Sequence, residues 1–258
     1  MPELPDVEVF SRNLNTLFSG KKLLKVKVVN GKKLKNSQKE FSKKLKGKTL
    51  TDIYRSGKEM RFAFDNGTLL GLHLMLTDDI FVFEKKNEHK FTIAELYFEG
   101  GAGIALTDRM RNASIQLDPQ DKAGVDALSK ELNYRYLKKV FQRKATIKTI
   151  LMDQNIIRGI GNGYSDEILW KTRISPYSIA AAVPDEKIKA LVRNIKKVLK
   201  DSTEEIYKAY PGITSGEIKD FLKIHTRKQS TSPTGKKIKI DTKGSRKTYY
   251  TEEQILYT

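Results

Sequence analysis

The chain has 258 residues, which is enough for one large domain or two ordinary domains with a buried core. Its 49 Lys+Arg outnumber its 31 Asp+Glu, and the formal net charge of +18 favours a polyanionic partner, because each neutralised phosphate releases counterions. A ribosomal protein or a membrane-surface protein would carry a similar charge. The charge therefore indicates a class of partner but no reaction.

Cysteine is absent, which excludes disulfides, thiolate zinc sites and a cysteine nucleophile. The three histidines, His73, His89 and His225, are too scattered to predict a metal site. No apolar run approaches the ~20 residues of a membrane span, and the acidic start lacks the features of a secretory signal. We expect an intracellular protein without a membrane segment.

The N-terminal part begins as a helix and continues as strands. An apolar stripe predicts a helix over residues 6–17. Up to about residue 117, short runs such as LLKVKVV, EMRFAF and FTIAELYF are separated by turn signals that include Asn30-Gly31. Strands at this spacing predict an antiparallel sandwich or barrel. The lysine-rich segment 21–48 is typical of a solvated edge.

The pattern becomes helical after residue 126, so we expect a domain boundary near residues 118–130. Helical runs are ALSKELNYRYLKKVF, the segment from TIKTILM to DEILWKT, and DEKIKALVRNIKKVLKDSTEEIYKAY. Asp185 is placed to cap the last of these. From about His225 the chain is polar, basic and β-capable.

The opening MPELPDVEVF has two interpretations. In the first, Pro2 and Pro5 stiffen a lead-in, and the acids are solvated or cap the helix that follows. In the second, Met1 is removed and Pro2 carries a free secondary amine, which loses its proton far more readily than a lysine. Such an amine can attack a carbon and form an iminium, as in Schiff-base catalysis.

The segment QNIIRGIGNGYSDEIL places glycine at three alternating positions, 159, 161 and 163, around Asn162. Glycine lets the backbone turn tightly and approach a ligand, and the N–H groups that begin the next helix can bind phosphate. An ordinary helix–helix corner with Asn162 as a local cap is the other interpretation. The net charge favours phosphate binding.

Four motifs in family order resemble the formamidopyrimidine-DNA glycosylase and endonuclease VIII family. They are PELPDVEV, RSGKEMRFAFDNGTLLGLHLMLT, KTILMDQNIIRGIGNGYSDEILWKTRISP and GSRKTYYTEEQ, and they span nearly the whole chain. The resemblance implies an α+β, two-lobed fold with a leading helix and an N-terminal antiparallel β-sandwich. A C-terminal helical domain with a helix–two-turn–helix and a β-hairpin finger would follow. It implies three parts, residues 1–122, 123–222 and 223–258.

The resemblance implies a bifunctional DNA glycosylase and AP lyase of base-excision repair. Pro2 would attack C1′ of the damaged nucleotide and expel the base, and Glu3 would protonate the sugar ring oxygen. Lys58 would act in proton transfer and hold a phosphate, although one lysine among so many could equally be surface charge. Arg246 would hold the phosphate beside the lesion and support β,δ-elimination. No metal or organic cofactor is required.

The resemblance also assigns DNA contacts, and the reaction needs the nucleotide rotated out of the helix into a basic cleft. Residues near the family's DNA-contacting positions are His73, Leu76, His89, Arg111, Lys144 and Asn162. Leu76 occupies the expected intercalating position, and Asn112 replaces an aromatic wedge. The implied partner is double-stranded DNA with oxidised bases or abasic sites.

The finger departs from the family pattern. The family's zinc-binding Cys-x-x-Cys pairs align with Thr231 and Thr234, and with Thr251 and Gln254. We therefore predict a finger without zinc, which depends on its hairpin and on apolar packing against the helical part. The residues expected to supply that packing are Ile238, Ile240 and Tyr249.

The residues expected to set lesion preference also depart from the family pattern. The stretch PGITSGEIKDFL is shorter than the family loop that covers 8-oxoguanine, and Asp6 replaces a more usual glutamate. We expect weak 8-oxoguanine activity, with formamidopyrimidines, oxidised pyrimidines or abasic sites as substrates.

Two other functions are considered: a non-catalytic damaged-DNA-binding protein on the same scaffold, and a basic RNA-binding or ribosomal protein. Retention of Pro2, Glu3, Lys58 and Arg246 together argues against the first, and the opening motif against the second. We expect a monomer located in the cytoplasm with the nucleoid, or in the nucleus of a eukaryote.

Overall fold

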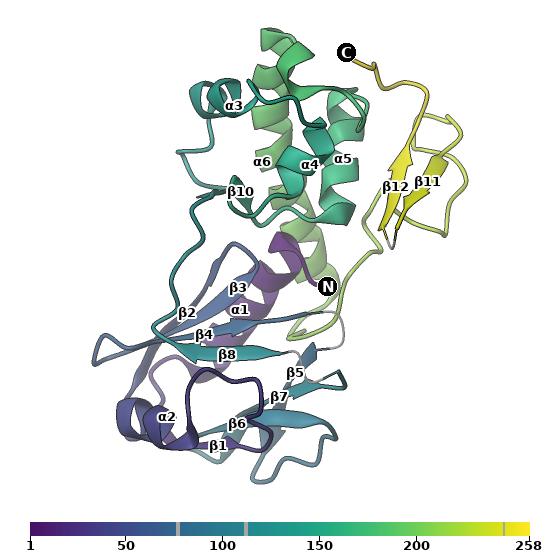
Figure 1. Cartoon of the computed structure of the whole chain (residues 1–258). Coiled ribbons are helices and arrows are strands. Elements are labelled where there is room, and N and C mark those ends of the chain that lie inside the picture. The colour runs from purple at the N-terminus through teal and green to yellow at the C-terminus, as the bar shows by residue number, and fades with distance from the viewer. Residues whose placement is uncertain (76–77, 111–112, 245) are drawn as a thin grey trace. The chain divides into compact units, whose positions relative to one another are not determined.

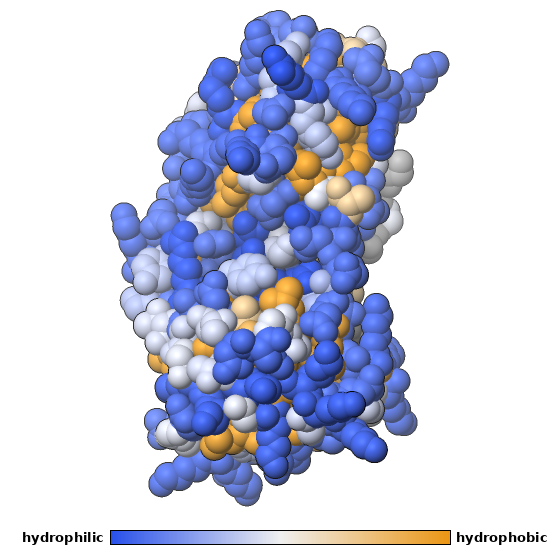
Figure 2. Space-filling view, turned by 90° about the vertical axis from the view of Figure 1, so that its left-hand side faces the viewer, coloured by the Kyte–Doolittle hydropathy of each residue, from blue (hydrophilic) through white to orange (hydrophobic). Residues whose placement is uncertain are grey.

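The computed structural model describes residues 1–75, 78–110, 113–244 and 246–258 (Figure 1). The chain forms two compact units. Unit 1 comprises residues 1–121 and 206–217, and unit 2 comprises residues 122–205 and 218–258. Among the described residues, no helix combines the length and apolar character needed to cross a membrane. The face shown in Figure 2 is covered mainly by hydrophilic side chains, in keeping with the charged composition.

Unit 1 opens with helix α1, Leu4–Phe18, which confirms the predicted first helix and begins two residues earlier. Pro5 lies in the first turn, where its missing N–H removes no helical hydrogen bond. The Glu3 N–H donates to Asp6 Oδ2 at 2.8 Å, so this acid caps the helix start. The apolar stripe is buried, with Phe10 and Leu14 fully covered.

Two four-stranded antiparallel sheets follow α1, as the sandwich prediction expects. The first sheet has the order β1 (Leu23–Val28), β6 (Thr92–Phe98), β7 (Ala102–Asp108), β5 (Asp78–Glu84). The second has the order β2 (Leu50–Ser56), β3 (Glu59–Phe64), β4 (Leu69–His73), β8 (Ser114–Leu117). Residues of α1 and of both sheets form one buried apolar core, so the helix and the strands are mutually dependent.

The lysine-rich segment contains helix α2, Gln38–Leu45, which the sequence analysis did not predict. Ser37 and Glu40 form a capping box, in which the Ser37 N–H donates to Glu40 Oε2 at 2.8 Å and the Glu40 N–H donates to Ser37 Oγ at 3.3 Å. Phe41 and Leu45 are buried, so only part of this segment is a solvated surface.

Unit 2 contains four helices, one 3-10 turn and four short strands among the described residues (Figure 1). In chain order these are β9 (Val125–Asp126), α3 (Tyr134–Val140), α4 (Ile147–Met152), β10 (Ile157–Arg158), α5 (Asn162–Thr172), η1 (Ala180–Ala182), α6 (Asp185–Ala209), β11 (Lys239–Lys243) and β12 (Arg246–Tyr250). Strands β9 and β10 pair in parallel, and β11 and β12 form an antiparallel hairpin. Helix α6 continues beyond residue 205, where unit 2 gives way to unit 1.

Two helix predictions need correction. The run predicted as helical from residue 127 to 141 is helical only over α3, because Asn133 caps a helix that begins there: the Tyr136 N–H donates to Asn133 Oδ1 at 3.0 Å. Asp185 was predicted to cap the last helix, but it is the first residue within α6. Its carboxylate pairs with Lys138 Nζ at 2.5 Å.

The finger hairpin is partly anchored as expected. Ile238 and Tyr249 form a buried cluster with Trp170 of α5 and with Ile224, which precedes the hairpin in the chain. The prediction was wrong for Ile240, whose side chain is 47% exposed. Ile240 lies opposite the buried Tyr249 in the β11–β12 register, so the two side chains share a face and the alternation of strand faces does not explain the exposure of Ile240. The three-part domain boundaries stay a prediction.

Candidate active site

The start of α1 presents a proline and an acid at fixed positions in unit 1. Pro2 and Glu3 are both buried, with Glu3 6% exposed. The backbone of Glu3 is held by its hydrogen bond to Asp6. In the unprocessed chain, the Met1 amino group lies 3.3 Å from Glu217 Oε2, and Pro2 is acylated by Met1.

Lys58 lies in the tight turn between β2 and β3, where Gly57 has φ = +62°. Left-handed backbone of this kind favours glycine. Arg55 NH1 donates to the Gly57 carbonyl at 3.0 Å, and Arg55 Nε pairs with Glu8 Oε2 at 3.1 Å. Because Glu8 belongs to α1, this chain of contacts ties the Lys58 turn to the helix that begins with the proline. The Lys58 side chain is itself buried, at 8% exposure.

The hairpin that carries Lys58 is further fixed at its base. Arg61 pairs with Glu59 at 2.9 Å and with Asp121 at 3.0 Å, and Ser56 Oγ donates to the same Asp121 carboxylate at 2.8 Å. Arg61 also donates to the Pro119 carbonyl. The β2–β3 turn is therefore held by contacts to α1 through Arg55 and by contacts to Asp121 through Arg61 and Ser56.

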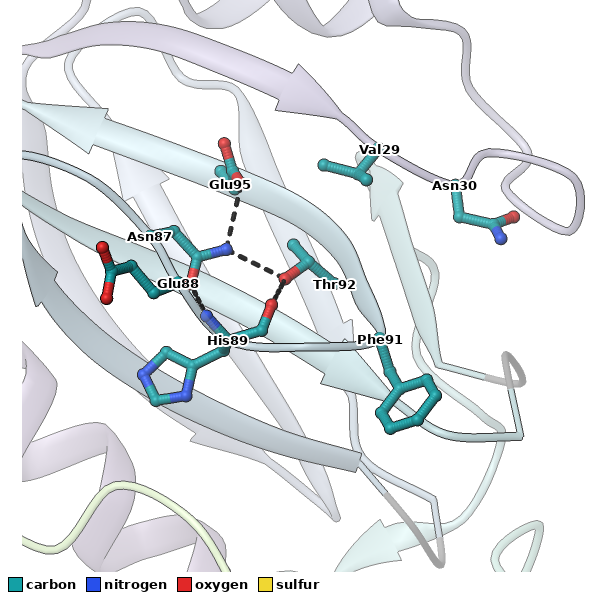
Figure 3. A pocket seen from close by; sticks show the side chains of 8 residues that line it. All are labelled: Val29, Asn30, Asn87, Glu88, His89, Phe91, Thr92 and Glu95. Atoms are coloured by element: carbon teal, nitrogen blue, oxygen red, sulfur yellow. Dashed lines mark hydrogen bonds between the residues drawn. The ribbon is translucent and has the colours of Figure 1, made fainter.

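The two histidines predicted to contact DNA also belong to unit 1. His73 ends β4 opposite Ser114 of β8, and it is half-buried. His89 is exposed, and its ring stacks on Phe81 with centroids 3.9 Å apart and planes 5° apart. Figure 3 shows its backbone hydrogen-bonded to Asn87 and Thr92. Leu76, Arg111 and Asn112 lie outside the described residues.

The cavity drawn in Figure 3, of about 460 Å³, has Glu95 at one wall. Asn87 Nδ2 and Tyr97 OH donate to this carboxylate at 2.9 and 2.5 Å. Burial alone would raise the pKa of Glu95, but these hydrogen bonds and Lys27 together hold it below its usual range. Burial and the same carboxylate raise the pKa of Tyr97 to about 12. Glu95 is thus a structural anion that fixes the loop carrying His89.

Two buried carboxyl groups face each other in the same sheet. Asp78 and Asp108 are opposite residues of β5 and β7, and they are 4% and 0% exposed. Burial, together with the neighbouring Asp108, raises the pKa of Asp78 to about 7. Asp78 Oδ2 accepts from the Met75 N–H at 2.7 Å, and Asp108 Oδ2 accepts from the Ala113 N–H at 2.7 Å.

A cavity of about 600 Å³ in unit 2 brings together two predicted phosphate-binding residues, Asn162 and Arg246. Asn162 begins α5 after the glycine-rich turn, and its Nδ2 donates to the Lys247 carbonyl at 2.9 Å. Arg246 begins β12 and is exposed. Lys144 is exposed in the turn before α4 and is not among the residues that line this cavity.

The wall of this cavity contains an ion-pair network that the sequence analysis missed. Lys148 Nζ pairs with Asp166 Oδ1 at 2.6 Å and donates to Thr248 Oγ1 at 2.8 Å. Asp166 is fully buried, and its Oδ2 accepts from His225 Nδ1 at 2.7 Å and from the Tyr249 N–H at 2.9 Å. One carboxylate of α5 therefore ties β12 to the helices.

Comparison with protein families assigns both halves of the chain. The profile of the formamidopyrimidine-DNA glycosylase N-terminal domain matches residues 1–115, and that of the formamidopyrimidine-DNA glycosylase H2TH domain matches residues 123–209. The chain belongs to the formamidopyrimidine-DNA glycosylase family. The resemblance stated from the four motifs is confirmed.

Individual members of the formamidopyrimidine-DNA glycosylase family agree. The chain is 34% identical over 215 residues to the formamidopyrimidine-DNA glycosylase of Ligilactobacillus salivarius, covering 79% of this chain and 78% of that one. It is 32% identical over 248 residues to that of Mycoplasma genitalium, covering 88% and 86%.

Solved structures share the fold. Lactococcus lactis Fpg in complex with abasic-site DNA has a TM-score of 0.85 at 20% identity, covering 96% of this chain and 97% of that one. The wild-type Lactococcus lactis protein with DNA containing an oxidised pyrimidine has a TM-score of 0.85 at 21% identity, covering 97% and 98%. The predicted α+β architecture, with antiparallel sheets first and helices after them, is confirmed.

Proposed function

We propose that this chain is a DNA glycosylase with AP lyase activity in base-excision repair, with Pro2 as its nucleophile once Met1 is removed. Membership of the formamidopyrimidine-DNA glycosylase family supports the activity. The observation that carries the nucleophile is the buried Pro2–Glu3 pair at the capped start of α1. A protein that only binds DNA has no use for an imino terminus in that position.

The chemistry uses this chain's own side chains. The Pro2 nitrogen attacks C1′, the bond from C1′ to the base breaks, and the base leaves with a proton. Glu3 protonates the ring oxygen as the sugar opens, which leaves an iminium between Pro2 and C1′. A secondary amine gives an iminium without an N–H, so it stays cationic. It withdraws electrons while C2′ loses a proton and the 3′ phosphate departs, and then while C4′ loses a proton and the 5′ phosphate departs.

Lys58 serves the eliminations by moving protons and holding a phosphate, and Arg246 supports the second elimination by holding the phosphate next to the lesion. The Glu8–Arg55–Gly57 contacts support the role of Lys58, because they fix its turn to α1. The cavity that contains Arg246 and Asn162 supports phosphate binding by unit 2, with Lys144 as an outer contact. His73, His89, Leu76 and Arg111 are proposed to contact DNA around the lesion.

The proposed substrate is double-stranded DNA with an oxidised base or an abasic site. Two neighbours in structure are Lactococcus lactis complexes with an abasic site and with an oxidised pyrimidine. Because the stretch PGITSGEIKDFL is shorter than the family loop that covers 8-oxoguanine, we expect the activity on 8-oxoguanine to be weak. A panel of single-lesion duplexes tests this, and 8-oxoguanine opposite cytosine as best substrate would contradict it. We propose action as a monomer in the cytoplasm with the nucleoid, or in the nucleus of a eukaryote.

Borohydride trapping on an abasic-site duplex tests the nucleophile. Protein lacking Met1, verified by mass spectrometry, should become covalently attached to DNA through its first residue. Protein that retains Met1 is the matched control, because its Pro2 nitrogen is an amide. Binding to the duplex by both forms with trapping by neither would refute the enzyme and favour a non-catalytic damage-binding protein.

A further inference from the structure

The finger of this chain does not suit zinc. The family resemblance places the four ligands at Thr231, Thr234, Thr251 and Gln254, whereas structural zinc sites use thiolates and imidazoles. In the part of the chain that the structure describes, no group of three or more His, Cys, Asp or Glu could hold a metal ion. Other contacts must therefore join the two turns of the finger.

The amide of Gln254 is engaged at both ends inside the protein. Its Oε1 accepts from the Thr251 N–H at 2.8 Å, and its Nε2 donates to the Ile174 carbonyl at 2.8 Å. The side chain is 8% exposed. Gln254 thus connects the turn after β12 to the residues that follow α5.

One carboxylate oxygen of Glu253 is contacted by donors from three segments of the chain. We call Glu253 and its four donor residues, Thr234, Thr251, Trp170 and Arg173, the Glu253 cluster. Thr234 Oγ1 and Thr251 Oγ1 donate to Glu253 Oε2 at 2.7 and 3.2 Å, one from each turn of the finger. From α5 and its C-cap, Trp170 Nε1 lies 3.4 Å and Arg173 NH1 lies 2.6 Å from the same oxygen. The cluster therefore contains a hydroxyl from each position where the family carries a zinc-ligand pair.

Arg173, which pairs with this carboxylate, has an unusual backbone conformation. It caps α5 with φ = +60° and ψ = +40°, a left-handed conformation that L side chains rarely adopt. Its guanidinium lies 5.3 Å from the centre of the Trp170 ring. Burial alone would raise the pKa of Glu253, but Thr234, Arg173 and Trp170 together hold it below its usual range. Glu253 is accordingly an anion at neutral pH.

We propose that Glu253 joins the finger to α5 in the structural role that zinc has elsewhere in the family, and that it is a positioning residue for Arg246. Strand β12 begins at Arg246 and ends at Tyr250, directly before Thr251 of the cluster. At its other end, Asn162 holds the Lys247 carbonyl. Both ends of the strand are thereby fixed, and Glu253 acts on DNA binding only through that strand.

The first experiment compares Glu253→Gln with Glu252→Gln in the full chain. Both remove one negative charge from the same turn, but Glu252 pairs with Lys236 at the surface, where its side chain is 58% exposed. Hydrogen exchange should accelerate about tenfold or more at the N–H groups of Tyr249 and Thr251 in the first variant. It should stay unchanged in the second. Equal protection in wild type and both variants would overturn the proposal.

The second experiment tests positioning, and its DNA readout rests on the proposed function. Glu253→Gln should weaken binding to an abasic-site duplex in the wild-type background and leave it unchanged in an Arg246→Ala background. Equal weakening in both backgrounds would show that Glu253 acts on DNA independently of Arg246. If wild-type protein binds no DNA, the proposed function fails, while hydrogen exchange still tests the cluster.

A rescue experiment separates the two ways of joining the finger. Thr231→Cys, Thr234→Cys, Thr251→Cys and Gln254→Cys are combined with Glu253→Ala. Zinc should restore slow exchange in β12, and a chelator should reverse it. Metal analysis of the wild type should find no bound zinc. Stoichiometric zinc whose removal accelerates exchange in the wild-type finger would refute the proposal.

Discussion

Replacing Asp78 by asparagine should remove a pH dependence of stability. Asp78 and Asp108 face each other in a buried cross-strand pair, and burial with this neighbour raises the pKa of Asp78 from 3.8 to about 7. The protonated carboxyl is therefore favoured by folding. Its contribution to stability is complete below the unfolded pKa and is lost as the pH rises through the folded one. The wild type should lose stability between about pH 4 and pH 7 and change little above that from this group.

The magnitude follows from the size of the shift. Each pKa unit corresponds to about 1.4 kcal/mol, so the full shift sets an upper limit of about 4 kcal/mol on the loss across this range. In the Asp78→Asn variant, the new side-chain amide can accept from the Met75 N–H and donate to Asp108 without titrating. The variant should match the wild type near pH 4 and exceed it at pH 8.

Urea unfolding at a series of pH values measures this difference directly. Asp79→Asn is the control, because it removes a neighbouring charge on β5 but leaves Asp78 able to ionise, so most of the slope should persist. Parallel stability profiles for wild type and Asp78→Asn from pH 4 to pH 8 would refute the reasoning.

Three other predictions concern the helices and the hairpins. Glu8→Ala should slow strand cleavage about tenfold by releasing the Lys58 turn from α1, in a single-turnover lyase assay; an unchanged rate would contradict it. Lys148→Met should lower the free energy of unfolding by about 3–5 kcal/mol, because it leaves a buried carboxylate of α5 without its cation; denaturant unfolding that loses under about 1 kcal/mol would contradict it. Ile238→Ala should cost about 2–4 kcal/mol and Ile240→Ala under about 1 kcal/mol, measured the same way, because Ile238 is buried and Ile240 is 47% exposed; equal losses would contradict this difference in burial.

Local patterns predicted the elements whose signals lie within a few residues. The stripe of α1 and the strand–turn alternation of unit 1 are of this kind, because burial of one face imposes a short period on the sequence. Helix α2 carried such a signal in Ser37 and Glu40, but a lysine-rich composition masked it. Helix α3 was predicted too long, since its apolar residues continue upstream of the Asn133 cap.

The contacts that arrange the candidate site were not predictable from the sequence. Glu253 meets Trp170 across 83 residues, and His225 meets Asp166 across 59. No periodicity spans such distances, so only the fold reveals these pairings. Pro2 and Asn162 were already candidates from their local sequence, whereas Glu3, Lys58 and Arg246 were found through the family motifs. The catalytic and binding roles of all five stay predictions.

The polar contacts of the Glu253 cluster join oxygen and nitrogen atoms and involve no sulfur, in a chain without cysteine. Peroxides convert thiolates to sulfenic and higher acids, and the oxidants that damage bases attack such sulfur as well. A carboxylate that holds its partners by charge offers those reagents no comparable target. The contacts that hold the finger of this chain should therefore persist under the oxidising conditions that damage DNA bases.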